Sequence, residues 1–366
     1  MHEAKSLESA LKKHLIMNAA RVNFAAGFIL ALLKAGSVNF NKIALAFTGQ
    51  ATKESKYKRV QRFFANFSLD LEMVAMFIAE LIPVKSSCWV ISIDRTNWKF
   101  GKMNINILTL GIVYMGIAFP ILWISLDKRG NSNTKERISL IAQFLKLFGV
   151  SKIQCIVADR EFIGIAWFEY LLNAGLTFRI RIKENILVTN SRGIQVPVKQ
   201  LFRQLKPGTT QVLNGKRNVM GHDLYIVGSM LSDGEYLILV TDKNPGEALS
   251  DYKKRWGIET LFGCLKTRGF NFESTHMTKL ERVEKLVALL AIAFTWCHII
   301  GEWKNDRKAI TIKKHGRKAI SIFRYGFDEL REILFDISQR LADFQRTIEI
   351  LFSYVDPSFR VVNRVI

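Results

Sequence analysis

The sequence contains little cysteine. Four cysteines occur among 366 residues, and none belongs to a C-x-x-C pair, which argues against a zinc site. Their apolar surroundings predict reduced core thiols of a cytoplasmic protein. The first 15 residues mix charged with apolar side chains, so we also expect no secretory signal. The cysteines are Cys88, Cys155, Cys264 and Cys297.

Acidic residues are scarce relative to basic ones. Lys and Arg number 53 against 32 Asp and Glu, which gives a formal net charge of +21. Such an excess predicts a polyanionic partner, with DNA or RNA first and an anionic membrane surface second, although a generic basic protein has the same charge. The hydrophobic content of 49% favours a globular protein, and the length allows two or three domains.

One stretch without charge, residues 103–126, is long enough to cross a bilayer. Asparagines, glycines and a proline interrupt it, and β-branched and aromatic residues are frequent. We therefore predict two buried strands, 106–114 and 120–126, joined by a turn. The apolar run 286–300 contains His298 and predicts a buried helix, so no membrane span is expected.

Residues 1–85 have a helical pattern, which predicts an N-terminal helical DNA-binding domain. A helix over 37–47, a turn, and a basic helix over 53–67 are compatible with a helix-turn-helix that reads DNA. Lys58, Arg59 and Arg62 on the basic helix are the predicted DNA contacts. The alternative is an amphipathic bundle with a solvated basic face.

Strands and helices alternate from residue 86 onward. The order β-β-β-α-β-α-β over 86–183 predicts an α/β fold with a mixed sheet covered by helices. Residues 184–242 form a predicted β-rich insertion that includes a hairpin over 224–241. The second part of the core, 243–303, contains a long helix over 246–268 and an apolar helix over 279–300. Residues 304–366 form a basic and then helical C-terminal region.

Two aspartates end predicted buried strands. Asp94 follows Trp-Val-Ile-Ser-Ile, and Asp159 follows the strand 153–158. Sites in layered α/β sheets are usually built at strand ends, and a buried aspartate has a desolvation cost that other contacts must offset. A single aspartate at a strand end could equally well cap the following turn, but two such aspartates favour a functional site.

The helix 246–268 carries a polar stripe. Tyr252, Arg255, Glu259 and Lys266 stand at i, i+3, i+7 and i+14, on a face roughly 60° wide. Alone, this pattern is typical of a solvated helix. Together with the two aspartates it predicts phosphoryl transfer, in which carboxylates hold two Mg²⁺ ions about 4 Å apart. Arg255 and Lys266 would then grip phosphates, and Tyr252 would donate a hydrogen bond to one.

The contexts of these residues resemble a known family. Ile-Ser-Ile-Asp-Arg-Thr-Asn-Trp around Asp94, Ile-Val-Ala-Asp-Arg-Glu-Phe around Asp159, and the stripe of the helix are similar to DDE transposases of bacterial insertion sequences. The stripe matches the pattern Y-x2-R-x3-E-x6-K of that family. Over about residues 40 to 300 the resemblance implies a ribonuclease-H-like core, interrupted by a β-strand insertion before the glutamate helix. It implies Asp94, Asp159 and Glu259 as catalytic ligands of Mg²⁺ or Mn²⁺.

The resemblance also implies an activity. The protein would bind the terminal inverted repeats of its own element, cleave double-stranded DNA there through a hairpin intermediate, and join the ends to a target. It would act as a homodimer in the synaptic complex, in the cytoplasm with the nucleoid. The alternatives are an inactive DNA-binding relative and a metal-dependent endonuclease without strand joining.

One residue implied by the resemblance is missing. The family leads us to expect a tryptophan in the insertion that stacks on a flipped base, but no tryptophan lies between Trp167 and Trp256. The available aromatic residues are Tyr225, Tyr236 and Phe202.

Other residues allow two interpretations. Trp98 and Lys99 either touch DNA or belong to the core, and Arg160 and Glu161 either orient the site or pair with each other. His276 and His298 have no metal-like partners, which predicts a structural role.

Overall fold

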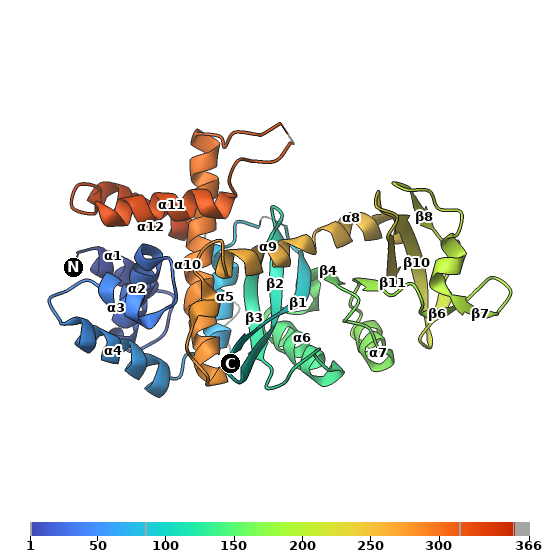
Figure 1. The fold of residues 1–366 in the computed structure, drawn as a ribbon, viewed down its shortest axis with the longest axis horizontal. Helices are drawn as coiled ribbons and strands as arrows, with labels where there is room; N and C mark the ends of the chain where they lie inside the picture. Colours follow the sequence, from blue (N-terminus) through green and yellow to red (C-terminus); the bar gives the residue numbers. More distant parts are fainter. Residues whose placement is uncertain (1, 85, 315, 354, 356–366) are drawn as a thin grey trace.

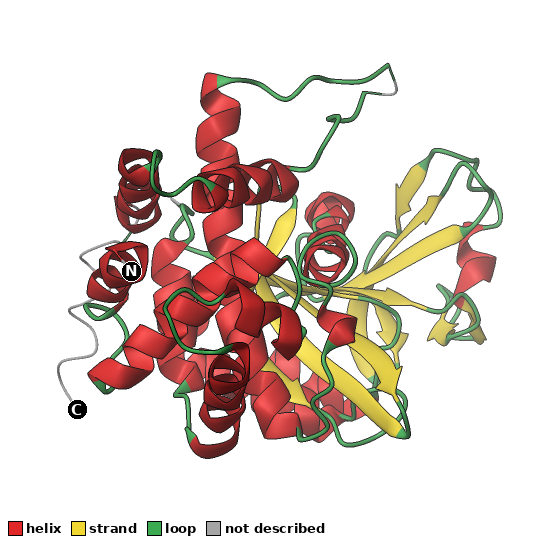
Figure 2. Ribbon diagram, turned by 60° about the vertical axis from the view of Figure 1, so that its left-hand side comes forward, coloured by secondary structure: helices red, strands yellow, loops and turns green. Residues whose placement is uncertain are grey.

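A computed structural model describes residues 2–84, 86–314, 316–353 and 355 of the chain. The N-terminal helices lie at one end of the molecule and the strands of the insertion at the other (Figure 1). Figure 2 shows the strands gathered on one side, with most helices packed beside them. The fold is therefore mixed α/β with a helical N-terminal region, as predicted.

Five helices form the N-terminal region. They are α1 (His2–Leu11), α2 (Ala19–Ala35), α3 (Phe40–Ala46), α4 (Lys53–Asn66) and α5 (Leu71–Leu81). Helix α3 is shorter than predicted because the Asn39 side chain accepts hydrogen bonds from the N–H groups of Asn41 and Lys42 and so fixes its start. The N–H of Val38 instead donates to the carbonyl of Phe270, which ties this segment to the core.

The core sheet has the predicted order of elements. Its strands are β1 (Trp89–Phe100), β2 (Met103–Tyr114), β3 (Ile117–Ser125), β4 (Ile153–Ala158) and β5 (Phe178–Ile182), in the spatial order β3-β2-β1-β4-β5. Strands β1 to β3 are antiparallel, whereas β4 runs parallel to both β1 and β5. Helices α6 (Thr134–Phe148) and α7 (Ile165–Asn173) connect the parallel strands. The capping box of Asn133 and Glu136 is present, as predicted.

The uncharged stretch 103–126 is a strand pair, as predicted. Met115 and Gly116 form the turn with φ angles of +48° and +80°, which suits a two-residue hairpin. The prediction that the first strand ends at Asp94 is wrong, because β1 continues to Phe100 along β2. Its parallel pairing with β4 does stop at Ile93, so Asp94 is the first residue beyond that ladder.

The insertion extends the core sheet. The hairpin of β10 (His222–Met230) and β11 (Tyr236–Thr241) is present as predicted, and β11 pairs antiparallel with β5. Within the described residues the strands form one 11-stranded sheet. The smaller strands are β6 (Leu187–Thr189), β7 (Gln195–Pro197), β8 (Thr210–Val212) and β9 (Arg217–Val219). Short 3₁₀ helices span Val150–Lys152, Val198–Phe202, Pro245–Glu247 and Phe272–Ser274.

The single helix predicted over 246–268 is two helices, α8 (Ala248–Lys253) and α9 (Trp256–Leu265). At the joint, the N–H of Lys254 donates to Asp251 O at 3.0 Å and that of Arg255 to Tyr252 O at 2.9 Å. These three-residue hydrogen bonds tighten the turn as in a 3₁₀ helix, so residues three apart nearly eclipse. The joint therefore brings Tyr252 and Arg255 to one side.

Three helices complete the fold: α10 (Leu280–Arg307), α11 (Ile322–Phe335) and α12 (Leu341–Ser353). Helix α10 runs between helices α1 to α4 and the sheet, whereas α5 packs on β3 (Figure 1). Among the described residues it alone is long and apolar enough to cross a membrane, and 94% of its apolar window is buried inside the protein. The bent pair α2 and α3, with an angle of 103°, passes the same test only jointly. The predicted buried helix over 286–300 is thus confirmed as part of α10.

Helix α9 lies directly on the start of β3. A Cβ atom at Gly257 would lie 2.9 Å from the carbonyl carbon of Ile117 and 3.0 Å from the amide nitrogen of Ala118. Only glycine allows this approach, because backbone atoms cannot move aside as a flexible side chain would.

We predict that Gly257→Ala destabilises the protein by about 1–3 kcal/mol, because α9 must move off the sheet. Thermal unfolding should show a lower Tm. Gly246→Ala is the matched control, since nothing lies within 4 Å of a Cβ atom there. Equal Tm values for Gly257→Ala and wild type would show that α9 is free to shift.

Candidate active site

Strand register brings the two predicted aspartates together. Ile93 and Ala158 are partners in the parallel ladder of β1 and β4, and each is followed by an aspartate. Asp94 Oδ1 accepts the N–H of Arg95 at 2.7 Å, and Asp159 Oδ1 accepts the N–H of Arg160 at the same distance. The two carboxylates therefore leave the sheet from adjacent strands, and each is held by a backbone donor.

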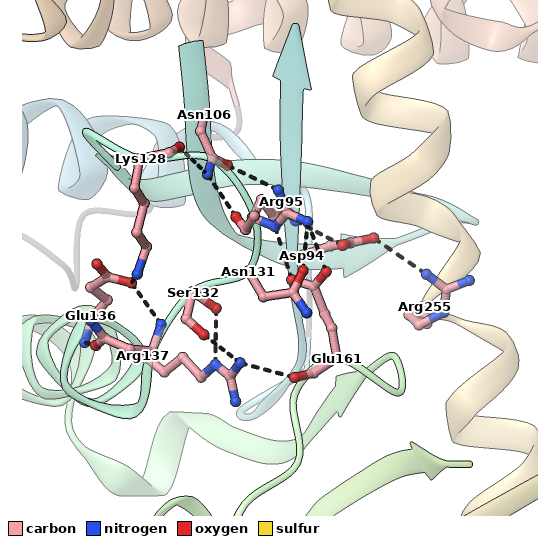
Figure 3. A network of polar contacts seen from close by, with 12 residues as sticks. Asp94, Arg95, Asn106, Lys128, Asn131, Ser132, Glu136, Arg137, Glu161 and Arg255 are labelled. Carbon is pink, nitrogen blue, oxygen red and sulfur yellow. Dashed lines mark hydrogen bonds and ion pairs between the residues drawn. The ribbon is translucent and has the colours of Figure 1, made fainter. Parts of the chain in front are cut away.

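Helices α8 and α9 present three side chains to these aspartates. Arg255 Nη1 lies 3.3 Å from Asp94 Oδ2, and its Nη2 lies 2.5 Å from Glu259 Oε1. The Tyr252 hydroxyl donates to Asp159 Oδ1 at 3.4 Å. The structure thus joins the three predicted acids into one cluster, in which Arg255 bridges two of them (Figure 3 shows Asp94 and Arg255).

Lys266 lies apart from this cluster. It follows α9 as the C-cap, and its ammonium lies 2.8 Å from Glu273 Oε1 and 3.3 Å from Asn97 O. It also lies 5.5 Å from the ring centroid of Trp98, which packs edge-on against Phe272. Lys266 therefore stands along β1 beyond Asp94, and half-buried Trp98 contributes to packing.

A polar network that the sequence did not reveal supports Asp94. Arg95 donates to both carboxylate oxygens of Glu161 at 3.1 Å, to Asn106 Oδ1 at 3.2 Å and to Asn131 Oδ1 at 3.0 Å (Figure 3). Glu161 is therefore the partner of Arg95 and orients the surroundings of the site. The available signal was a basic residue, Arg95, directly after the aspartate that follows an apolar run.

Buried Arg137 on α6 holds the loop after Asp159. Its guanidinium donates to the carbonyls of Ser132 at 2.6 Å, Glu161 at 2.9 Å and Ile163 at 3.3 Å, and it lies 5.0 Å from the ring centroid of Phe162. Bonding several carbonyls through one planar group restricts the loop, because a guanidinium has donors in fixed directions.

A second buried ion pair fixes α8 on the sheet. Arg179 Nε lies 3.3 Å from Asp251 Oδ2, and the two side chains are 2% and 5% exposed. Arg179 also donates to the carbonyl of Lys243 at 2.9 Å, and Lys254 lies 2.9 Å from Asp251 Oδ1. Removing one partner would leave a buried charge uncompensated, so this pairing holds the residue next to Tyr252 in place.

The electrostatics of the cluster favour a cation. Burial, helped by the nearby carboxylates of Glu161 and Asp159, raises the pKa of Asp94 to about 7 against the lowering effects of the Arg95 N–H and Arg255. Burial lowers the pKa of Arg255, but Tyr252, the Glu259 hydrogen bond and Asp159 outweigh it and the net pKa is raised. Arg255 therefore stays charged among the acids.

The three acids are oxygen donors from separate elements, which is the donor type that Mg²⁺ and Mn²⁺ prefer. Among the described residues, no group of three or more Asp, Glu, His or Cys side chains stands close enough together to hold a metal ion. The three acids thus have the right donor chemistry for such an ion. In this structure, however, the guanidinium of Arg255 lies between Asp94 and Glu259.

The predicted DNA contacts lie on α4. Lys58, Arg59 and Arg62 are all exposed. Arg59 also supports the fold, because it donates to Asn23 Oδ1 at 2.9 Å and lies 5.6 Å from the ring centroid of Phe24. Lys58 and Arg62 are thus the better probes of an external partner.

The aromatic candidates differ in access. Phe202 is fully buried, and its ring fills the space where a Cβ atom of Gly228 would lie, so it cannot stack on a base. Tyr236 lines a cavity of about 510 Å³ together with Arg160, Arg181 and Lys183. Trp256, which the sequence reasoning did not consider, is 64% exposed. The remaining candidate, Tyr225, lies with its ring centroid 5.4 Å from the ammonium of Lys216.

The histidines contact neighbouring side chains. His298 is 3% exposed and its Nε2 lies 3.1 Å from Glu302 Oε1. His276 stacks on Phe100 at 4.9 Å between ring centroids.

We predict that Asp94→Asn gains stability relative to wild type as pH rises. In wild type the raised pKa of Asp94 means that its carboxyl group ionises more readily in the unfolded chain than in the folded protein. Ionisation therefore favours unfolding, and wild type loses stability as the pH rises toward about 7. In EDTA, urea denaturation should give Asp94→Asn an advantage about 2 kcal/mol larger at pH 8 than at pH 5. Exposed Asp223→Asn is the control, and equal pH dependence of both variants would contradict the burial of Asp94.

Comparison with known proteins places this architecture in a family. A family model described as "Transposase DDE domain" matches residues 86–296, which is more than half of the chain. The chain is also similar to the structure titled "Cryo-EM structure of piggyBac transposase synaptic complex with hairpin DNA (SNHP)", with a TM-score of 0.45 and 13% identity over 96% of this chain and 81% of that chain. No curated protein matches its sequence. From the extent of the family match, this chain belongs to the DDE transposases.

Proposed function

We propose that this transposase cleaves DNA at the ends of its own element and joins those ends to a target, with Asp94, Asp159 and Glu259 as its catalytic acids. The observation that carries the proposal is that these three acids, from β1, the end of β4 and α9, belong to one cluster linked by Arg255 and Tyr252.

The acids would hold Mg²⁺, or Mn²⁺ in its place. When bound, a pair of such ions supplies charge neutralisation and activation of the attacking oxygen in phosphoryl transfer. Arg95 and Glu161 would keep Asp94 oriented, and Arg137 would keep the loop after Asp159 in place. The contribution of the protein is to hold the carboxylate oxygens in fixed positions.

Three side chains are proposed to contact the DNA backbone near the acids. Arg255 offers a planar fork that matches a phosphate, and the Tyr252 hydroxyl can donate to a phosphate oxygen. Lys266, which lies near Asn97 farther along β1, would contact a phosphate beyond the cleavage point.

The core is proposed to be ribonuclease-H-like. The order β3-β2-β1-β4-β5, with three antiparallel and two parallel strands, supports this assignment. The proposed units are 1–85, 86–183, 184–242, 243–303 and 304–366. The pairing of β11 with β5 indicates that the insertion would be positioned firmly against the catalytic core.

Double-stranded DNA is the proposed partner, both as element end and as target. The net charge of +21 and the exposed Lys58 and Arg62 support it. We further propose recognition of terminal inverted repeats by the α4 region, a homodimer in the synaptic complex, and action at the nucleoid in the cytoplasm. For a hairpin step, Tyr236 and Trp256 offer aromatic faces for an unstacked base.

A non-catalytic DNA-binding protein and a nuclease that does not join strands are the alternatives. The charged cluster around half-buried Asp94 argues against the first, because a protein that only binds DNA does not need acids whose burial is unfavourable. Products in which an element end is joined to target DNA would exclude the second.

We predict that Asp94→Ala, Asp159→Ala and Glu259→Ala each lower Mg²⁺-dependent cleavage of element ends by about a thousandfold or more while DNA binding stays within a few-fold. Cleavage gels and gel-shift titrations on the same substrate measure the two effects. Exposed Glu169→Ala is the control and should cleave normally. Normal cleavage by Glu259→Ala would refute the site.

We predict that Lys58→Ala combined with Arg62→Ala weakens binding to element ends. Loss of two phosphate contacts should reduce the slope of log affinity against log salt by about 2. Fluorescence anisotropy over a salt series measures this slope. The control is the double variant Lys12→Ala and Lys13→Ala, which removes the same charge from exposed positions of the same region. If both double variants lost the same affinity for element ends, the net charge rather than α4 would be responsible.

A further inference from the structure

Arg255 occupies the position between two of the proposed metal ligands. Its Nη1 lies 3.3 Å from Asp94 Oδ2 and its Nη2 lies 2.5 Å from Glu259 Oε1. The Arg255 side chain is only 10% exposed, so the pairing is not a loose surface contact. One guanidinium thus neutralises carboxylates from β1 and α9.

A divalent cation shared by Asp94 and Glu259 would lie in the gap between the two carboxylates that the guanidinium now fills. A guanidinium and a divalent cation cannot both fill that gap, because both are positively charged and would repel each other strongly at such a short separation. Binding of the metal therefore requires Arg255 to release at least one of its partners.

A DNA phosphate is a suitable acceptor for the released guanidinium. Phosphate offers it the same bidentate geometry as carboxylate. The Glu259 side chain is 38% exposed, so the Arg255–Glu259 contact lies on the open side of the cluster, where a phosphate can approach. The guanidinium carbon lies 5.7 Å from the centroid of the Tyr252 ring, so this ring limits its movement on that side.

We propose that Arg255 is an internal counter-ion that keeps divalent metal from the acids until a DNA phosphate takes over its guanidinium, so that metal and DNA bind cooperatively. This rests on the proposed function, since it takes Asp94 and Glu259 as the ligands. Free of DNA, the protein has its acids neutralised by its own side chain. With DNA, the same side chain grips phosphate and leaves the carboxylates to the metal.

The first test is Mn²⁺ binding to the DNA-free protein, followed by the paramagnetic loss of the free-ion signal. Arg255→Gln should bind Mn²⁺ roughly tenfold more tightly than wild type, because charged hydrogen bonds of this kind no longer compete. Arg268→Gln is the matched control, since it removes the same charge from an exposed position after α9 and should stay near wild type. If Arg255→Gln binds Mn²⁺ no more tightly than Arg268→Gln does, the proposal is overturned.

A double variant separates this inference from the proposed function. Adding Asp94→Asn to Arg255→Gln should abolish the tightened Mn²⁺ binding. If the double variant binds Mn²⁺ as tightly as Arg255→Gln alone, Asp94 is not a ligand and the proposed site itself is wrong. If it loses binding while Arg255→Gln shows no gain over wild type, only the counter-ion role fails.

The cooperativity is tested with Ca²⁺, used as a metal probe in place of Mg²⁺ to slow cleavage. Linkage requires that metal tighten DNA binding by the factor by which DNA tightens metal binding. Ca²⁺ should therefore increase the affinity of wild type for element-end duplex by a larger factor than that of Arg255→Gln. Equal factors overturn the coupling.

A measurement on wild type covers the case in which Arg255→Gln does not fold. The Nε–H signal of Arg255, identified by its absence in Arg255→Lys of ¹⁵N-arginine-labelled protein, should shift when Mg²⁺ and element-end duplex saturate the protein together. A signal that remains unchanged at saturation contradicts the exchange of partners.

Discussion

The parallel pairing of β1 with β4 is the constraint on which the site depends. Because Ile93 faces Ala158 in that ladder, the next residue of each strand is an aspartate at the same edge of the sheet. A shift of one residue would turn one carboxylate to the opposite face. The apolar residues of both strands are buried against helices, so this register is strongly specified.

The third acid depends on a helix that is held at three points. Gly257 lets α9 approach the backbone of β3, the 3₁₀ joint turns Arg255 toward the aspartates, and the buried Arg179–Asp251 pair anchors α8. None of these contacts is catalytic in itself. Together they decide where Glu259 lies, because a helix end displaced by one ångström carries its side chains with it.

Charge balance connects the fold to the chemistry. Burial chiefly, and the carboxylates of Glu161 and Asp159 in addition, raise the pKa of Asp94, while Arg95 pairs with Glu161 and Arg255 pairs with Asp94. Arg95 makes four side-chain hydrogen bonds within the protein and therefore acts as a fixed support. Arg255 has partners that a cation can replace, which makes it the adaptable part of the site.

The sequence by itself determined most of the local elements and singled out the acids that are proposed to be catalytic. Alternating and uninterrupted apolar patterns located the strands, the capping residues located α6, and the spacing from Tyr252 to Glu259 indicated a shared face. These features are encoded by neighbours in the chain, so they are readable without a structure.

Only the tertiary structure decided where the helix breaks, which partner Arg95 takes and where Lys266 points. A helical wheel assumes an unbroken helix, but the joint at Arg255 and the helix end at Leu265 alter the positions of Arg255 and Lys266. Glu161, the partner of Arg95, lies 66 residues away in sequence, and the burial of Phe202 depends on packing against Gly228. Such contacts arise from long-range packing and register, for which a single sequence contains no local signal.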